Sequence, residues 1–371
     1  MQRREFLTRA LSAPVFTAAW KQGIPAAFEN EILEFMAVAP VPGAVIGIIR
    51  NGAAVSIRPL GVRSLETHAT VTSDTIFHAA SLSKQVAVYA AFALRDAGKL
   101  EFDRTLFSYV GDLPEGRARK VTVRQVLSHS SGFPNWRSSP TAPLAPEFEP
   151  GSAFQYSGEG FFYLQRILEQ VSGLGYCELI EHLVFRPLSM TSSSMIWKPE
   201  FADRYALPHG RHGEPRPNWD ARAKRLYEIA QQKGQNIAAW RYPEYESAAR
   251  EAGITPVPDN LLPNAAASLI TTGPDYSRFL KAALRNPEIR REQIRFRPTL
   301  AWGLGWGIER AAGSEYLWQW GDNPGFKNFM VAEPESGEAV FVFTNGDSGA
   351  HIYDRVVTHA TGHDHPALFW V

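Results

Sequence analysis

Strand-like patterns lie near both ends of this chain, and helix-like patterns fill its middle. Near the start, residues 43–57 form two apolar segments joined by Asn51-Gly52, a dipeptide typical of tight β-hairpins. Near the end, three more apolar segments follow one another, at residues 302–308, 326–332 and 340–344. The sequence therefore predicts an α+β fold in which both chain ends form one antiparallel sheet with flanking helices.

The middle of the chain is expected to be mainly helical. Residues 81–97 are apolar on nearly all sides and are followed by Gly98, which predicts a buried central helix with a glycine cap. Residues 198–262 are rich in charge, proline, glycine and aromatic side chains, which indicates an insertion with a helix at 221–230. Further helices are expected at residues 161–171, 275–284 and 351–361.

These patterns suggest one domain, residues 28–371, made of two parts. Residues 28–80 and 290–371 are assigned to a sheet subdomain. Residues 81–289 are assigned to a mainly helical subdomain that carries the insertion.

The composition excludes several classes of protein. Lys+Arg and Asp+Glu each number 38, and the resulting net charge of zero argues against a dedicated nucleic-acid binder. The single cysteine, Cys177, cannot form an internal disulfide, and we expect it to pack as a small apolar side chain. No run of about 18 apolar residues occurs, so we expect no integral membrane span.

The first residues match a twin-arginine export signal. Two adjacent arginines, at positions 3 and 4, are followed after one residue by Phe6 and Leu7 and then by a mildly apolar segment. The alternative is an unstructured tail with two chance arginines. No clear cleavage motif follows, so the mature start is expected between residues 19 and 27. We assign residues 1–27 to the signal and expect a periplasmic or extracellular protein.

A Ser-x-x-Lys pattern, Ser81 to Lys84, stands at the start of the most apolar predicted helix. Side chains three residues apart lie on one face of a helix, so the lysine can reach the serine hydroxyl. A lysine kept neutral by burial can take the hydroxyl proton, and the serine N–H at the helix start favours a developing oxyanion. Taken alone, the pattern also fits an exposed lysine without a chemical role.

Two further segments carry candidate groups. Residues 149–158 run from a Pro-Gly turn to Tyr156, and a tyrosine on a loop can act as general base or proton relay. Residues 318–327 are rich in glycine and aromatic side chains, and an edge strand there offers backbone N–H groups to an oxyanion. Taken singly, the tyrosine is explained as well by packing, and the second segment by an Asn-Pro-Gly turn.

Three histidines stand near the C-terminal end, at His359, His363 and His365. Apart from Asp364, no carboxylate or cysteine accompanies them in a ligand-like arrangement. We therefore expect no metal site and assign these residues to a solvated tail.

Together these segments resemble the serine β-lactamase and penicillin-binding-protein superfamily, in particular its class C branch with D-alanyl-D-alanine carboxypeptidases and related esterases. The resemblance begins at about residue 28 and covers nearly the whole chain. Residues 121–134 are similar to the family's LLxHTSGLP box, in which the family's histidine, here His129, has a structural role. Other similar segments are Pro150-Gly151, Arg186 to Met190, Trp302 to Trp306 and Phe343 to Asn345.

The resemblance implies a β-lactamase-like fold, no metal or organic cofactor, and a role for each matched residue. Ser81 would be the nucleophile that forms an acyl-enzyme, and Lys84 would accept or relay its proton. Tyr156 would activate Ser81 or the deacylating water and would protonate the leaving group. The backbone N–H groups of Ser81 and Asp322 would form the oxyanion hole.

Two substrate-binding positions depart from the family's pattern. Gly158 stands where the Tyr-x-Asn box has an asparagine that can hydrogen-bond a substrate amide. Gln319, Trp320 and Gly321 stand where the family has Lys-Thr-Gly or His-x-Gly, so the cation and the small hydroxyl are both absent. Those two groups would pair with the carboxylate of a β-lactam or a D-Ala terminus. Their loss favours esters or amides without a carboxylate beside the scissile bond.

The sequence thus predicts an exported serine hydrolase that cleaves an ester or amide of a small molecule or peptide through a Ser81 acyl-enzyme. One alternative is a true β-lactamase or D-alanyl-D-alanine carboxypeptidase. The other is a non-catalytic protein that binds a cell-wall peptide or a partner protein. The presence of Ser81, Lys84 and Tyr156 argues against this second alternative.

Overall fold

The structure is a computed structural model that describes residue 20 and residues 23–139, 142–254 and 262–371. The predicted export signal falls mostly outside these residues. Within the described ranges, no helix is both long enough and apolar enough to cross a membrane.

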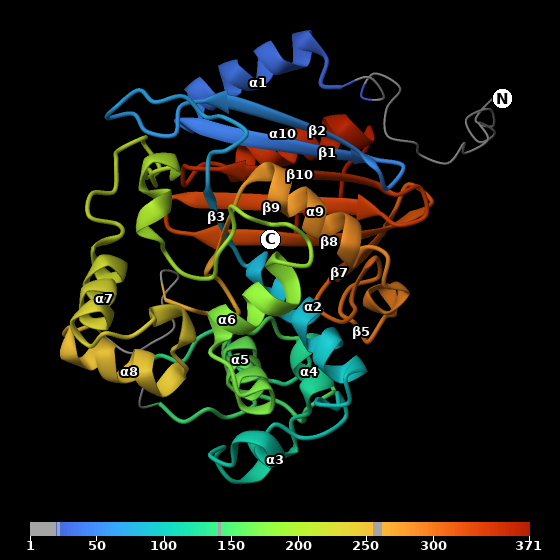
Figure 1. The fold of residues 1–371 in the computed structure, drawn as a ribbon. Coiled ribbons are helices and arrows are strands. Elements are labelled where there is room, and N and C mark those ends of the chain that lie inside the picture. The colour runs from blue at the N-terminus through green and yellow to red at the C-terminus, as the bar shows by residue number, and fades with distance from the viewer. Residues whose placement is uncertain (1–19, 21–22, 140–141, 255–261) are drawn as a thin grey trace, which may run out of the picture.

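One eight-stranded antiparallel sheet forms the centre of the molecule (Figure 1). It contains two strands from the start of the chain and six from the end, which confirms the predicted α+β architecture. In spatial order the strands are β2 (Ala54–Gly61), β1 (Gly43–Arg50), β10 (Glu338–Thr344), β9 (Phe326–Glu333), β8 (Ser314–Asn323), β7 (Gly307–Ala311), β6 (Leu300–Trp302) and β5 (Ile294–Arg295).

Strand β1 joins the two ends of the chain. It pairs with β2 through the predicted hairpin at Asn51-Gly52 and with β10 on its other side, where Ile46 lies opposite Val342. Both faces of β1 are buried: Ile46 belongs to one apolar cluster and Val45 to another. A strand covered on both faces needs apolar side chains at successive positions, which explains its continuous apolar run.

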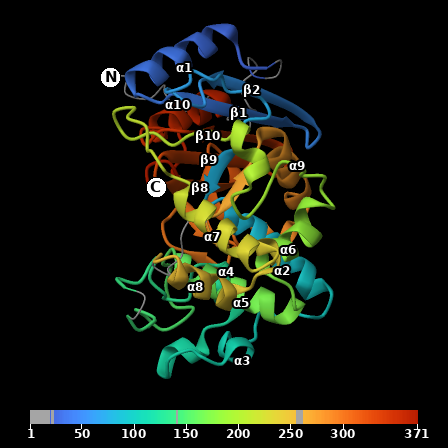
Figure 2. The same cartoon turned by 60° about the vertical axis from the view of Figure 1, so that its left-hand side comes forward.

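Helices cover the sheet on both sides. Helices α1 (Ala26–Val38) and α10 (Ala350–Thr361) pack together, and α10 also contacts β9 and β10. Helix α9 (Gly273–Ala283) packs against β1 and β2. Figures 1 and 2 show the helices of the middle region gathered on the side of the sheet away from α1.

The middle region is mainly helical, as predicted. A short two-stranded sheet, β3 (Phe77–Ala80) with β4 (Leu269–Thr271), leads into it. The buried central helix is confirmed as α2 (Ser83–Asp96), and the insertion contains the expected helix as α7 (Ala221–Gln232). The other helices are α3 (Phe107–Val110), α4 (Val123–Leu127), α5 (Gly158–Ser172), α6 (Tyr176–Ile180) and α8 (Tyr242–Glu251). Cys177 is buried in α6, as expected.

The expected strand at residues 302–308 is wrong in one respect: it is two strands. Strand β6 ends at Trp302, β7 begins at Gly307, and the residues between them turn away from the sheet. Gly305 in this turn has a left-handed φ of 81°, and its amide donates a hydrogen bond to the carbonyl of Leu127 at 2.7 Å. This turn therefore contacts the end of α4. A residue other than glycine at position 305 would strain the backbone of the turn.

The histidines near the C-terminal end do not form a solvated tail, which corrects that expectation. His359 accepts a hydrogen bond from the indole of Trp20 at 2.7 Å, and His363 contacts the hydroxyl of Tyr316 at 3.0 Å. His365 is fully buried and ion-paired with Glu309 of β7. Each ring has a partner that is distant in the sequence, and these partners, which local patterns do not reveal, make burial of the polar rings favourable.

Candidate active site

Ser81 lies in the turn between β3 and α2. The residue before it, Ala80, is fully buried and has a left-handed φ of 51°, which costs a non-glycine residue about 1–2 kcal/mol. Ser83 stabilises the turn, because its hydroxyl donates to the carbonyl of Ala80 and accepts from the amide of Leu269. Strain that the surrounding structure maintains is typical of functional sites.

Lys84 points back to Ser81 from the first turn of α2. Its Nζ lies 3.1 Å from Ser81 Oγ and donates to the carbonyl oxygen of Ala266 at 2.8 Å. The side chain is only 2% exposed, and burial lowers the pKa of the Lys84 amine well below that of a free lysine. The alternative of a solvent-exposed first-turn lysine is therefore excluded.

Tyr156 completes this cluster from the loop before α5. Its hydroxyl accepts from Gln319 Nε2 at 3.0 Å and interacts electrostatically with the Ser81 side chain. Burial raises the pKa of the Tyr156 phenol above its usual value, and the interactions with Ser81 and Gln319 lower it by less. The phenol is consequently protonated near neutral pH, so it is a proton donor in the resting site.

His129 supports the loop that carries Tyr156. Its carbonyl accepts from Gln155 N at 2.8 Å, its Nδ1 accepts from Ser157 N at 3.0 Å, and its ring lies 4.2 Å from the Tyr156 ring. Burial, with a smaller contribution from the Lys84 charge, lowers the pKa of His129 well below its usual value. A neutral, buried imidazole in this position orients the tyrosine.

Gln319 connects the sheet to the cluster. Its Nε2 donates both to the Tyr156 hydroxyl and to the carbonyl oxygen of Ser81, at 3.2 Å. Because a carbonyl oxygen only accepts, the second bond fixes which way the amide points. The pairing between β7 and β8 ends at Trp318, so residues 319–323 bond only to β9 and leave a free strand edge.

The residues that follow Gln319 lie along this edge. Gly321 passes so close to β3 that a Cβ atom there would be 2.4 Å from the carbonyl oxygen of Ala79. The ring of Trp320 lies 4.3 Å from that of Tyr156. The exposed carboxylate of Asp322 is paired with Lys327, and among the described residues no side-chain hydrogen bond connects Asp322 to Ser81.

Gly158, the first residue of α5, leaves room for an aromatic ring. A Cβ atom on Gly158 would be 2.4 Å from the ring of Trp136, which is 40% exposed. Trp136 was not among the predicted site residues, although it stands two positions after the 121–134 box in the sequence. The carbonyl of Ala266 was not predicted either, since no sequence pattern marks it.

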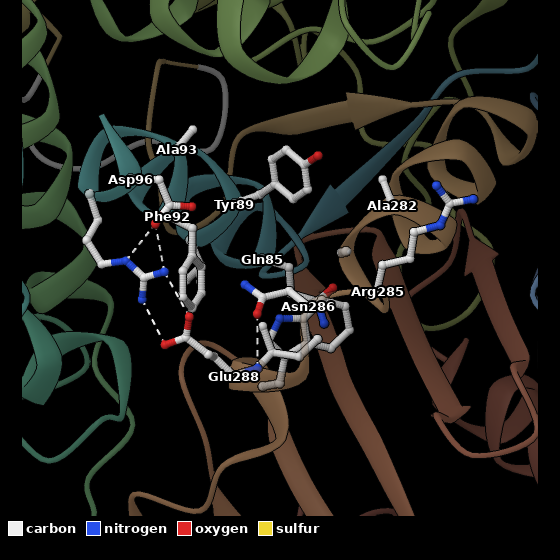
Figure 3. A pocket seen from close by; sticks show the side chains of 14 residues that line it. Gln85, Tyr89, Phe92, Ala93, Asp96, Ala282, Arg285, Asn286 and Glu288 are labelled. Atoms are coloured by element: carbon white, nitrogen blue, oxygen red, sulfur yellow. Dashed lines mark hydrogen bonds and ion pairs between the residues drawn. The ribbon is translucent and has the colours of Figure 1, made fainter. Parts of the chain in front are cut away.

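A hollow beside α2 lies on a different flank of that helix (Figure 3). This cavity of about 370 Å³ is bounded by α2, the end of α9 and the turn that contains Glu288. Arg95, which lines it, is ion-paired with Glu288 and Asp96. None of the predicted site residues lines this cavity.

Comparison with known proteins identifies the family. The family model described as Beta-lactamase matches residues 28–362. The chain belongs to the beta-lactamase family. Its fold resembles that of a class C beta-lactamase, with a TM-score of 0.72 and 17% identity over 93% of this chain and 98% of the other.

Curated relatives of the chain include penicillin-binding proteins and an esterase. Penicillin-binding protein 4 of Amycolatopsis lactamdurans is 27% identical over 205 residues, 48% of this chain and 52% of the relative. Esterase EstB of Burkholderia gladioli is 26% identical over 209 residues, 47% of this chain and 52% of the relative. The chain thus spans about half the length of the curated relatives it matches. The family and these neighbours are serine hydrolases of the beta-lactamase type.

Proposed function

We propose that this protein is a serine hydrolase that cleaves uncharged esters or amides through an acyl-enzyme on Ser81. The observation that carries the proposal is the convergence of a buried lysine and a buried tyrosine on Ser81. Lys84 Nζ lies 3.1 Å from Ser81 Oγ, and its neutral form can accept the Ser81 proton. Tyr156 interacts with the Ser81 side chain, and Gln319 donates to its hydroxyl, which leaves the phenol proton available for donation.

The first step of the proposed reaction forms the acyl-enzyme. Ser81 Oγ attacks the substrate carbonyl carbon while its proton moves to the neutral amine of Lys84. As the tetrahedral intermediate collapses, Tyr156 donates its proton to the leaving oxygen or nitrogen, and Lys84 returns a proton to the phenolate. Water then attacks the acyl carbon while the neutral amine of Lys84 takes its proton, and as the acyl–oxygen bond breaks, that proton passes to Ser81 Oγ, which releases the acid and free Ser81.

The oxyanion hole is proposed to consist of the backbone N–H groups of Ser81 and Asp322. The two-residue loop Pro324-Gly325 makes Asn323 and Phe326 the hydrogen-bonded pair at the end of the hairpin. The N–H groups alternate in direction along a strand, so the N–H of Asp322 points to the free edge of β8. This edge passes beside β3, next to the turn that holds Ser81.

The substrate is proposed to lack a carboxylate beside the scissile bond. Gln319 is neutral, and Lys84 is buried with a lowered pKa, so neither provides a fixed cation for an anionic substrate group. The half-buried Trp320 and the partly exposed Trp136 both lie at the Tyr156 loop and favour an apolar or aromatic substrate group.

Labelling with a fluorophosphonate probe tests the nucleophile. Wild type should be labelled and should hydrolyse p-nitrophenyl esters, whereas Ser81→Ala should do neither. Ser348→Ala, a serine distant in sequence from all predicted site residues, serves as the matched control. Absence of labelling in well-folded wild type would overturn the hydrolase proposal in favour of a non-catalytic binding protein. Turnover of nitrocefin at rates above those for simple esters would favour the β-lactamase alternative.

A further inference from the structure

The segment that follows α10 is attached to the sheet by a buried contact between a histidine and a carboxyl group. Glu309 of β7 and His365 are both fully buried, and their side chains are in direct contact. The second carboxylate oxygen of Glu309 accepts from the amide of Ala367 at 2.9 Å, and His365 Nε2 contacts the Thr361 hydroxyl at 2.8 Å. Because buried polar groups that lose their partners are costly, these contacts fix the position of the segment.

This attachment places Trp370 in a cluster of aromatic rings beside the candidate active site. Its ring centroid lies 5.3 Å from that of Trp320, 5.2 Å from Phe296 and 5.8 Å from Phe154. The rings of Trp370 and Trp320 meet at 86°, the edge-to-face arrangement that aromatic pairs favour.

Trp320 in turn contacts Tyr156, with 4.3 Å between the ring centroids. It lies on the free edge of β8, where β7 supplies no neighbouring strand. Its ring also contacts those of Trp370 and Trp318, at 5.3 Å and 5.9 Å between centroids, so ring packing fixes its orientation. Trp370 is itself half-buried and has no polar contact with the Ser81 cluster among the described residues.

We propose that Trp370 is a positioning and specificity-determining residue, which holds Trp320 against Tyr156 and thereby limits the space for the substrate's acyl group. This inference rests on the proposed hydrolase function. Removal of the Trp370 ring leaves a void that Trp320 can enter, since a side chain next to an unfilled space relaxes into it. The phenol of Tyr156 then loses a packing partner, and the acyl site becomes wider.

Steady-state kinetics with p-nitrophenyl esters of two, four and eight acyl carbons test the inference. For Trp370→Ala, kcat/KM for the two-carbon ester should fall about tenfold, because small misplacements of a reacting group are costly. The ratio of kcat/KM for the eight-carbon over the two-carbon ester should rise. Trp370→Phe, which keeps a ring, should retain most of the wild-type preference. Phe369→Ala is the matched control, because this neighbouring ring is 80% exposed.

The outcomes separate this inference from the proposed function. Active sites are counted by fluorophosphonate labelling, and folding is checked by thermal unfolding of each variant. If wild type is labelled at Ser81 but Trp370→Ala and Trp370→Phe keep the wild-type chain-length profile, the inference is wrong and the function stands. If wild type is not labelled at all, both are wrong. If Trp370→Ala fails to fold, Trp370→Phe and Trp370→Leu decide: a wild-type profile in both overturns the inference.

Discussion

At the residue scale, Lys84 is the group whose chemistry depends most on its surroundings. Its amine is buried beside Ser81 Oγ and a backbone carbonyl, with no carboxylate in hydrogen-bond contact among the described residues. Without a counter-charge, burial disfavours the ammonium form and lowers the pKa of Lys84. The lysine can therefore act as a base at pH values where an exposed lysine cannot.

This position predicts a pH dependence for hydrolysis. Because the pKa of Lys84 is lowered, kcat/KM should stay constant from mildly alkaline to neutral pH and fall only as acid protonates the amine. Lys84→Arg, which keeps a permanent charge, should lose about 10³-fold in kcat/KM. Lys99→Arg, at an exposed position, should match wild type. An acid limb near the pKa of free lysine would contradict the assignment.

Tyr156 gives a second prediction at this scale. Tyr156→Phe removes only the hydroxyl, while the contacts of its ring with His129 and Trp320 remain. We expect kcat to fall by about 10²–10³-fold with little change in melting temperature, because the leaving group loses its proton donor. The measurement is steady-state ester hydrolysis, with Tyr163→Phe on α5 as the control. Unchanged kcat would assign leaving-group protonation to another residue.

At the scale of elements, the site depends on where one strand, β8, ends and where one helix, α5, begins. Strand β8 is longer than its neighbour β7, and this difference in length creates the free edge at residues 319–323. Helix α5 begins at Gly158, after Ser157, whose hydroxyl caps the helix by accepting from Gly160 N at 2.9 Å. Gln319 at the end of β8 and Tyr156 before the start of α5 are thereby brought together beside Ser81.

The start of α5 yields a test of the aromatic rim. Gly158→Ala adds a methyl group where the Trp136 ring now lies, so the ring must move outward. Alanine is otherwise well tolerated in a helix, and we expect little loss of stability but a raised KM for apolar esters. Trp136→Ala should show the same KM effect without the steric clash. Equal KM values for wild type and both variants would exclude Trp136 from substrate binding.

At the scale of the whole molecule, both chain ends stabilise one body. Trp20 is fully buried, packs on Phe28 of α1 with ring centroids 5.3 Å apart, and donates to His359 of α10. Part of the region expected to hold the start of the mature chain therefore belongs to the folded body.

Trp20 gives a prediction for global stability. Trp20→Ala should lower the free energy of unfolding by about 3 kcal/mol, because a large buried ring and its hydrogen bond are lost. Esterase kinetics of the folded variant should stay near those of wild type. Urea denaturation measures the loss, with Phe35→Ala as control, since that α1 ring is 43% exposed. A urea midpoint for Trp20→Ala equal to that of wild type would show that the Trp20 ring does not stabilise the fold.

Whether the sequence predicts an element correctly depends on how far apart in the chain its interacting residues lie. The hairpin at Asn51-Gly52 and the central helix over 81–97 were predicted well, because turn sterics and side-chain periodicity act within a few residues. The single strand at 302–308 was predicted wrongly, because the turn at Gly305 is stabilised by a hydrogen bond to Leu127, which is distant in the sequence. His365 was misjudged for the same reason: its partner, Glu309, is distant in the sequence.

The sequence by itself determined which residues are chemically able to form the site: a serine and lysine one helical turn apart, a loop tyrosine, and a glutamine in place of a cation. Only the tertiary structure decided that Lys84 is hydrogen-bonded to Ser81 and that Gln319 is hydrogen-bonded to both Ser81 and Tyr156. It also decided that Trp370 lies two ring contacts from Tyr156. Burial sets the protonation of Lys84 and Tyr156, and burial is a property of packing between distant segments.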